Sequence, residues 1–297
     1  MKYIIDCTSQ NITIKDFLRK NHISSNLIKR LKKLPNGILV NGSHQNVTYK
    51  LAQNDVLEIN IDDFDEDTNT YLEPKNIPID IIYEDENITV VNKPSGMPTH
   101  ESLNNRGNSL ANALLYRYQN KPYVFRATNR LDKDTSGVVI TANNRLYASY
   151  LSKKIKDGQV KKQYIAIVTG EILNDGEIDA PIDRIGESII KRVVRENGEA
   201  SLTRYKVLKS SLSATVLLVT PVTGRTHQIR VHMAYIGHPI IGDKLYGGDS
   251  VLMPRQALHC LSMSIEGEGE YYAPLANDMR LLIRSYFDDE DFIPKNK

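Results

Sequence analysis

The sequence predicts an α+β fold, with a largely antiparallel mixed sheet in a large domain and a small α/β module before it. Strand-like runs outnumber helical runs and follow one another directly, which is typical of antiparallel sheets and not of doubly wound parallel ones. A chain of 297 residues can hold one domain of about 200 residues and a smaller one. We therefore expect a module at 1–60, a linker at 61–76 and the large domain at 77–290.

Charge changes sign along the chain, which supports this division. Residues 10–60 carry eight basic and three acidic side chains, a net charge of +5, whereas residues 61–73 carry six acids and no base. A basic module points to a nucleic-acid partner more than to a membrane. The acidic stretch lacks apolar periodicity and is typical of a flexible linker.

Two short helices are predicted in the module. Apolar residues recur at helical spacing in two sets, Ile14, Phe17 and Leu18, then Leu27, Ile28, Leu31 and Leu34. Ser24 and Ser25 separate the sets and can cap the second helix. GILVNG (37–42) and VLEINI (56–61) are predicted to be short strands.

The second of these helices carries a basic cluster. Its members are Lys29, Arg30, Lys32 and Lys33. Four such residues alone are typical of a solvated helix face, whereas their position on a helix–helix–strand module favours an RNA-binding surface. Both interpretations stay open at this point.

Strands and helices alternate from Ile77 onward. Strands are predicted at ITVVNK (88–93), GVVITA (137–142), VKKQYIAIVTG (160–170), LTRYKVLKS (202–210), ATVLLVTPVTG (214–224) and ALHCLSMSI (257–265). Helices are predicted at SLANALLYRY (109–118), NRLYASYLSKKIKDG (144–158, ended by Gly158), 229–236 and MRLLIRSYF (279–287).

Composition excludes several classes of protein. Apolar and charged residues make up 40% and 25% of the chain, as in ordinary soluble proteins. There is no apolar run of membrane-spanning length and no signal-like start, so we expect a cytoplasmic protein. Cys7 and Cys260 lack the spacing of a disulfide framework or a zinc site. GxGxxG, GxSxG and HExxH motifs are also missing, so we expect no nicotinamide cofactor, serine-hydrolase chemistry or metal.

NRLDKDTSG (129–137) places one carboxylate, Asp132, in a polar turn ahead of the apolar run 137–142. A lone Asp in a turn usually caps or closes the turn. Here Thr135, Ser136 and Gly137 can form a tight entry into the strand, which would put the acid at the mouth of a rigid sheet. Asp132 is therefore the candidate catalytic residue.

GRTHQIRVH (224–232) supplies two arginines and two histidines from one short stretch. We predict that Arg225 pairs with Asp132, because a nearby guanidinium keeps a carboxylate charged, as an attacking oxygen requires. The alternative for Arg225 is an ordinary salt bridge at a helix start. His227 and His232 are five apart and do not share a helix face. GDKLYGG (242–248) is predicted to be a turn-rich loop near the site.

Tyr164 lies in the strand-like run KKQYIAIV (161–168). It could be an ordinary sheet aromatic, or it could stack on a planar ring while Lys161 and Lys162 contact phosphates.

These strings together resemble the signature regions of the RluA-type pseudouridine synthases. NRLDKDTSG, KKQYIAIV and GRTHQIRVHMAYIGHPIIGDKLYGG occur in order, with YEDENITVVNKPSGMPTH before them and LHCLSMSI after them, so the resemblance covers roughly residues 77–285. Residues 1–60 more weakly resemble the ribosomal-protein-S-four type RNA-binding module.

The resemblance implies a role for each candidate residue. Asp132 would attack the uridine ribose, Tyr164 would stack on uracil, Arg225 would pair with Asp132, and Arg130 would enter the RNA as the target base leaves the stack. The reaction is an isomerisation, so it implies no cofactor and no metal. The family commonly has His where this chain has Asn129, and Asn can replace one imidazole hydrogen bond.

The leading hypothesis is an RNA pseudouridine synthase that acts on specific uridines of structured RNA. Ribosomal RNA of the large subunit is the favoured substrate, transfer RNA is the alternative, and a monomer is expected. Two other classes stay open: an inactive RNA-binding assembly factor on the same fold, and an aspartate-nucleophile glycoside or nucleoside hydrolase. The hydrolase would usually need a second carboxylate across the bond, and Asp134 is the near candidate.

Overall fold

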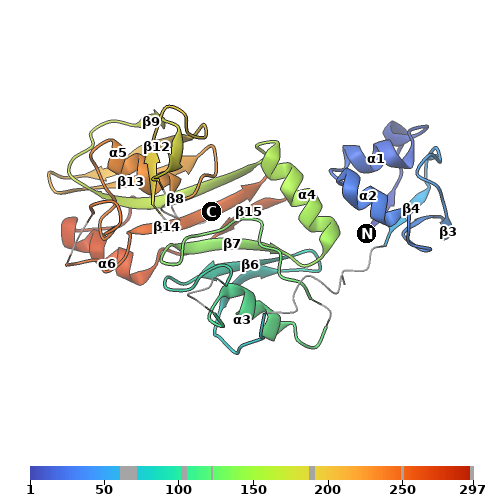
Figure 1. Cartoon of the computed structure of the whole chain (residues 1–297), viewed down its shortest axis with the longest axis horizontal. Coiled ribbons are helices and arrows are strands. Elements are labelled where there is room, and N and C mark those ends of the chain that lie inside the picture. Colours follow the sequence, from blue (N-terminus) through green and yellow to red (C-terminus); the bar gives the residue numbers. More distant parts are fainter. Residues whose placement is uncertain (61–71, 102–105, 122, 187–190, 249–250, 295–297) are drawn as a thin grey trace.

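The computed structural model describes residues 1–60, 72–101, 106–121, 123–186, 191–248 and 251–294. A small sheet with two helices forms one end of the molecule, and a large sheet flanked by helices forms the rest (Figure 1). Helix α4 (Arg145–Lys156) lies between the large sheet and the small module.

The small module contains four strands, two α-helices and one 3-10 turn within residues 1–60. They are β1 (Lys2–Ile4), the turn Cys7–Ser9, α1 (Ile14–Lys20), α2 (Ser25–Leu31), β2 (Ile38–Val40), β3 (Ser43–His44) and β4 (Val56–Ile59). The sheet order is β1-β4-β2-β3 and its described pairs are antiparallel.

The large domain adds the remaining elements. Its strands are β5 (Asp80–Glu84), β6 (Ile88–Lys93), β7 (Ser136–Ala142), β8 (Val160–Thr169), β9 (Gly176–Asp179), β10 (Ile182–Arg184), β11 (Arg192–Val194), β12 (Leu202–Ser210), β13 (Ala214–Pro221), β14 (Leu258–Ile265) and β15 (Gly269–Tyr272). Its other helices are α3 (Leu110–Arg117), α5 (Gln228–Tyr235) and α6 (Asn277–Tyr286).

Most of these strands form one mixed sheet. Its order in the described residues is β5-β6-β7-β14-β8-β13-β12-β9, with β15 added along β14. The pair β7–β14 is parallel, and the other pairs of this sheet are antiparallel. The predicted α+β class with a largely antiparallel sheet is thus confirmed.

Strand β7 runs through the middle of this sheet and is buried along its whole length. It pairs with β6 on one side and with β14 on the other. The continuous apolar run that predicted it, with no polar face, is what a strand covered on both sides requires. Its first residue, Ser136, lies four positions after Asp132, so β7 fixes where that acid stands.

The module has its own hydrophobic core, to which the large domain contributes one side chain. Ser24 caps α2 as the sequence predicts, since its Oγ accepts from the backbone N–H of Leu27 at 3.3 Å. Leu146, from the first turn of α4, is 5% exposed and packs into this core. Burial of a leucine side chain contributes about 1.5–3 kcal/mol, so Leu146 helps to attach the module to α4.

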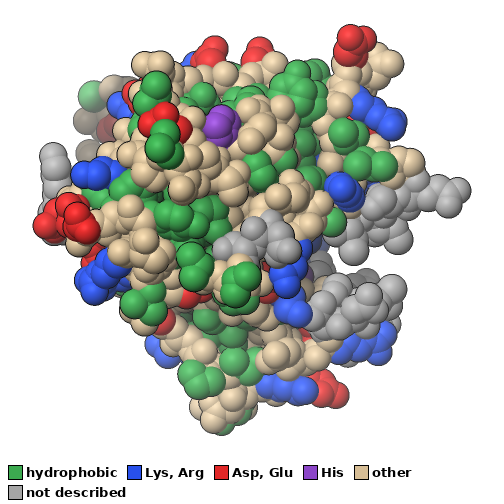
Figure 2. Space-filling view, turned by 90° about the vertical axis from the view of Figure 1, so that its left-hand side faces the viewer, with side chains coloured by type: hydrophobic (Ala, Val, Ile, Leu, Met, Phe, Trp, Pro, Cys, Tyr) green, Lys and Arg blue, Asp and Glu red, His purple; other side chains and the backbone are tan. Residues whose placement is uncertain are grey.

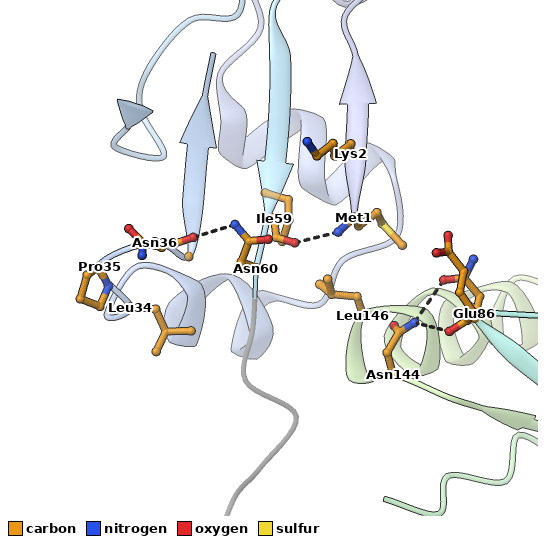
Figure 3. A pocket seen from close by; sticks show the side chains of 12 residues that line it. Met1, Lys2, Leu34, Pro35, Asn36, Ile59, Asn60, Glu86, Asn144 and Leu146 are labelled. Atoms are coloured by element: carbon orange, nitrogen blue, oxygen red, sulfur yellow. Dashed lines mark hydrogen bonds between the residues drawn. The ribbon is translucent and has the colours of Figure 1, made fainter. Parts of the chain in front are cut away.

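A cavity of about 680 Å³ lies beside this attachment point (Figure 3). Its walls come from the module, with Met1 and Ile59, and from the large domain, with Asn144 and Leu146. Asn144 also caps α4, accepting from the N–H of Tyr147 at 2.8 Å. The cavity therefore lies on the boundary between the two parts, and Asp132 does not line it.

Residues 61–71 of the predicted linker lie outside the described residues. The end of that predicted linker, in contrast, is held against α3. The Lys75 N–H donates to the carbonyl of Asn112 at 3.1 Å, and the Asn112 amide donates to the carbonyl of Glu73 at 2.8 Å. The division of the chain at 60 and 76 stays a prediction.

Gly137 allows β7 and β14 to lie side by side next to Asp132. Its φ is +110°, and a Cβ at this position would lie 2.1 Å from the carbonyl oxygen of Cys260. Only glycine fits such a backbone and such a close approach.

We expect Gly137→Ala to lower the free energy of unfolding by at least about 2 kcal/mol, because backbone strain and overlap with β14 act together. Gly158→Ala is the matched control, since its φ is +73° but a Cβ there would meet nothing within 4 Å. Urea unfolding of both variants checks this, and equal losses would contradict the role given to Gly137.

Candidate active site

Asp132 contacts two basic side chains from the segment 224–232. Its Oδ2 accepts from Nη1 of Arg230 at 2.8 Å, and Nε2 of His227 lies 3.7 Å from the same oxygen. The Asp132 side chain is 28% exposed, whereas that of Arg230 is 9% exposed. A partly open carboxylate is thus held by a buried guanidinium.

Arg230 also binds a second carboxylate. Its Nε and Nη2 donate to the two oxygens of Asp243 at 2.7 and 2.8 Å, a bidentate arrangement that fixes the plane of the guanidinium. The Tyr246 ring lies under it, with its centre 5.2 Å from Cζ. Asp243 and Tyr246 belong to the loop 242–248, which therefore lies beside the site.

The prediction that Arg225 pairs with Asp132 is wrong. Arg225 forms a salt bridge with Glu199, and its Nε donates to the carbonyl of Ala200 at 3.2 Å. Arg225 precedes the first turn of α5, whereas Arg230 lies within the helix, on the side turned to Asp132. The segment thus reaches Asp132 as predicted, but through its second arginine.

The two histidines of this segment have different surroundings. His227 stands at the start of α5 with φ of +56°, and its Nδ1 is 3.0 Å from the Tyr246 hydroxyl. Burial is the main cause that lowers the pKa of His227 below its ordinary value, so the ring is neutral at pH 7. His232 lies in the core, between the Thr203 hydroxyl at 2.8 Å and the Ala180 carbonyl at 2.9 Å.

Tyr164 lies on β8, opposite Cys260 of β14, and is 8% exposed. Burial raises the pKa of Tyr164 well above its ordinary value, and both Cys260 and the Asp132 charge raise it further. The phenol therefore stays protonated.

Lys161 and Lys162, which were predicted to contact phosphates, lie on opposite faces of β8. Lys162 shares the face of Tyr164, because side chains two apart in a strand point the same way. Burial lowers the pKa of Lys162, whereas Lys161 is exposed. Of the two, Lys161 is the one open to a ligand in solvent.

Lys93 holds the turn that carries Asp132 through hydrogen bonds to backbone carbonyls. Its Nζ donates to three carbonyls, those of Pro94, Met97 and Lys133, at 2.9, 2.7 and 3.0 Å. Lys93 is fully buried, and this burial lowers its pKa to about 7. The Lys133 carbonyl is one residue from Asp132, so Lys93 ties the turn to the end of β6.

The other side of the turn is held by residues that precede β14. Arg255 donates to the carbonyl of Asp134 at 3.0 Å and forms a bidentate pair with Asp278. The Gln256 amide donates to the Thr135 hydroxyl at 3.1 Å. The backbone after Asp132 is therefore fixed by side chains far away in the sequence.

Asn129 and Arg130 precede the acid and differ in exposure. Asn129 is 5% exposed; its amide donates to the carbonyl of Val138 at 3.0 Å and its oxygen accepts from the N–H of Ile140 at 3.0 Å. Asn129 thus fixes the segment that leads to Asp132 against β7. Arg130 is exposed, and its charge contributes to the lowered pKa of His100.

The basic cluster of the module is exposed as predicted. This holds for Lys29, Arg30, Lys32 and Lys33. Among the described residues, no group of three or more His, Cys, Asp or Glu side chains is arranged to hold a metal ion. In the same part of the chain, no helix is both long and apolar enough to cross a membrane.

Sequence reasoning missed Arg230, Asp243, Lys93 and Arg255. Arg230 could have been weighed beside Arg225, because both arginines belong to the same segment 224–232 and Arg230 falls inside the predicted helix 229–236. Lys93 closes an apolar strand just before Pro94, where a buried lysine needs several carbonyl acceptors. Arg255 carries no local signal, since the partners that tie it to the turn and to α6, Asp134 and Asp278, are distant in the sequence.

The pKa of Lys93 predicts a pH dependence of stability. The folded chain releases this proton near pH 7, whereas the unfolded chain holds it up to the ordinary pKa of 10.5. Between these values the unfolded chain binds more protons, so this group makes the free energy of unfolding rise with pH.

We therefore expect the stability of the wild type relative to Lys93→Met to increase from about pH 7 to pH 10, as measured by urea unfolding. Lys133→Met, at an exposed site, is the control, and its free energy of unfolding should depend on pH as that of the wild type does. If the free energies of unfolding of the wild type and Lys93→Met differ by the same amount across this pH range, the lowered pKa of Lys93 is contradicted.

Known proteins share much of this sequence. Residues 87–235 match the RNA pseudouridylate synthase family. The chain is 37% identical over 283 residues to the "Uncharacterized RNA pseudouridine synthase YjbO" of Bacillus subtilis, covering 92% of this chain and 99% of that protein. It is 39% identical over 203 residues to the "Ribosomal large subunit pseudouridine synthase D" of Xanthomonas campestris pv. campestris, covering 68% of this chain but 61% of the relative.

A solved structure shares the fold. It is titled "Human RNA Pseudouridylate Synthase Domain Containing 1", and it superimposes with a TM-score of 0.58 at 29% identity over 68% of this chain and 86% of that chain. The matched stretch contains β6 to α5, and with them Asp132, Tyr164 and Arg230. The chain therefore belongs to the RNA pseudouridylate synthase family.

Proposed function

We propose that this protein isomerises specific uridines of structured RNA to pseudouridine, with Asp132 as the reacting carboxylate. Membership of the family makes it an RNA pseudouridine synthase, an isomerase. The observation that carries the residue assignment is the pair of Asp132 with buried Arg230. A lone Asp in a turn would need no such partner.

The geometry fits a carboxylate that acts on a ribose. Arg230 and His227 both approach Oδ2, which leaves Oδ1 for the substrate. That oxygen could attack the anomeric carbon directly, or take a proton from the adjacent ribose carbon to give a glycal. Either route breaks the bond between uracil N1 and the ribose, and the free uracil then turns within the site.

The second half of the reaction joins uracil C5 to the anomeric carbon and releases the C5 proton. Tyr164 would stack on the uracil during this turn, which is the role that the family resemblance implies for it. It lies on β8, and β14 pairs with both β8 and β7, the strand that Asp132 precedes. Atoms and electrons balance without an oxidant or a second substrate, so the proposed chemistry uses no cofactor. Arg130, exposed next to the acid, would fill the space that the extruded base leaves.

Ribosomal RNA of the large subunit is the substrate that we favour. The ribosomal large subunit is named in the titles of several relatives, including the Xanthomonas campestris protein. The exposed cluster Lys29, Arg30, Lys32 and Lys33 supports an RNA-binding role for the module, which we propose to be ribosomal-protein-S-four-like. Transfer RNA is the alternative substrate, and we expect the protein to work in the cytoplasm, where both RNAs occur.

Release of tritium from RNA labelled at uridine C5 tests the proposal. The wild type should release tritium, and Asp132→Asn should lower the rate at least about 10³-fold, because the amide has no charge with which to react. RNA binding should persist in this variant.

Other outcomes of this assay would identify the other two classes of protein, the assembly factor and the hydrolase. Binding without tritium release in the wild type would indicate an inactive assembly factor. Formation of free uracil would indicate a hydrolase, with Asp134 as its second acid.

The two arginines of the segment 224–232 offer a matched comparison. Arg230→Lys keeps a charge but cannot bind Asp132 and Asp243 together, so tritium release should fall at least about 100-fold. Arg225→Lys changes a pair with Glu199 at the surface, so the rate should fall less than about threefold. Equal losses would contradict the assignment of Arg230 as the partner of Asp132.

A further inference from the structure

A groove of about 830 Å³ lies between the module and α4, on the surface where the two meet. One wall comes from the end of α1, the turn after it and α2; the other comes from α4. The lining residues are Arg19, His22, Ile23, Ser24, Ser25, Asn26, Leu27 and Arg30 on the first wall, and Arg145, Ala148, Ser149, Ser152, Lys153 and Lys156 on the second.

The groove is strongly basic. Five of its fourteen lining residues are Lys or Arg and none is acidic, although the chain as a whole has nearly equal numbers of both. Asp157 stands at the end of α4, where Lys153 binds it at 2.5 Å. The pKa of Asp157 is lowered first by Lys153 and also by Lys156, two residues that line the groove. The fourteen lining residues themselves therefore carry a net positive charge.

Direct contacts fix the two walls relative to each other. The N–H of Ser24 donates to Oγ of Ser149 at 3.0 Å, and the His22 ring lies 5.7 Å from that of Tyr150. Leu146 enters the core of the module one turn earlier on α4. The basic side chains of both walls thus stand at a set spacing.

The chemistry of the lining selects one kind of ligand. Four serines and Asn26 add hydrogen-bond donors for phosphate oxygens. None of the fourteen residues is Phe, Tyr or Trp, and His22 is the one aromatic ring among them, so the lining offers more positive charge than stacking surface. A basic lining with little stacking surface suits the phosphate backbone of paired RNA, which proteins recognise mainly by shape and backbone contacts.

The groove is also separated from Asp132. Strand β7 leads from the catalytic turn to the start of α4, and its seven residues span about 20 Å at 3.3 Å per residue. The opposite end of the large domain, near α6 and β12, presents mainly hydrophobic and other uncharged side chains at its centre, with Lys, Arg, Asp and Glu around the margin (Figure 2). A ligand of the groove is therefore distinct from the uridine that reacts.

We propose that this groove binds the phosphate backbone of a paired RNA segment flanking the target uridine, with α4 of the catalytic domain and α2 of the module gripping it jointly. The proposal rests on the proposed function, since it concerns the same RNA. It differs from binding by the module alone, because three of the five Lys and Arg residues belong to α4. The cluster at 29–33 contributes only Arg30 to this groove.

Exposed cations from the two walls provide the test. Arg19→Gln and Lys156→Gln, singly and together, change one wall or both. Each lost phosphate contact should weaken RNA binding about five- to eightfold at 0.1 M salt and lower the slope of log K against log salt by about 0.7–0.9. The control is Lys206→Gln with Lys209→Gln, two exposed lysines of β12 outside the groove.

Two RNAs distinguish binding in the groove from binding at the reacting site. Both carry the same target loop, one with a long paired flank and one with the flank removed. The groove variants should lose affinity for the first RNA only, and at saturating RNA their tritium release should equal that of the wild type. Circular dichroism checks that each variant is folded.

The proposal is overturned if the groove variants bind the long-flank RNA as the control does. It is also overturned if they lose binding to phosphatidylglycerol vesicles while RNA binding is unchanged. Absence of tritium release from the wild type would instead count against the proposed function, and the binding comparison would still decide about the groove.

Discussion

The bridge that Arg230 makes between Asp132 and Asp243 is the interaction on which the site depends. A guanidinium with 9% exposure needs anionic partners, and the fully buried Asp243 supplies a bidentate one. Removal of one member of a buried pair typically costs about 3–5 kcal/mol, because the remaining charge stays uncompensated. Asp243 thus fixes the arginine, and the arginine then fixes Asp132 in its partly open position.

The rest of the structure holds these three side chains in fixed positions relative to one another. Arg230 comes from α5, Asp243 from the loop 242–248, and Asp132 from the turn before β7. Lys93 and Arg255 hold that turn from two sides through backbone carbonyls. The turn itself has little regular structure, so its position is determined by long side chains that begin on neighbouring strands and loops.

Much of the fold could be predicted from local patterns. Ser24 caps α2, Gly158 follows α4, and the apolar run 137–142 is a central strand, because each of these depends on residues near in sequence. The segment 224–232 was correctly expected to reach Asp132. Which arginine faces the acid was not, because that depends on where α5 begins and on Glu199, a residue distant in the sequence that pairs with Arg225. Tertiary pairs of this kind leave no periodic signal.

The unbroken burial of β7 has a consequence for how such proteins can vary. A strand alternates its side chains between two faces, so insertion of one residue would exchange those faces along its length. Both faces of β7 are packed, and such a change would disrupt the core on either side. Among descendants of this chain, the separation between the turn at Asp132 and the start of α4 should therefore be nearly invariant. Differences in the RNA that these proteins recognise should accumulate at the end of β7 away from Asp132, in the side chains of α4 and of residues 1–60.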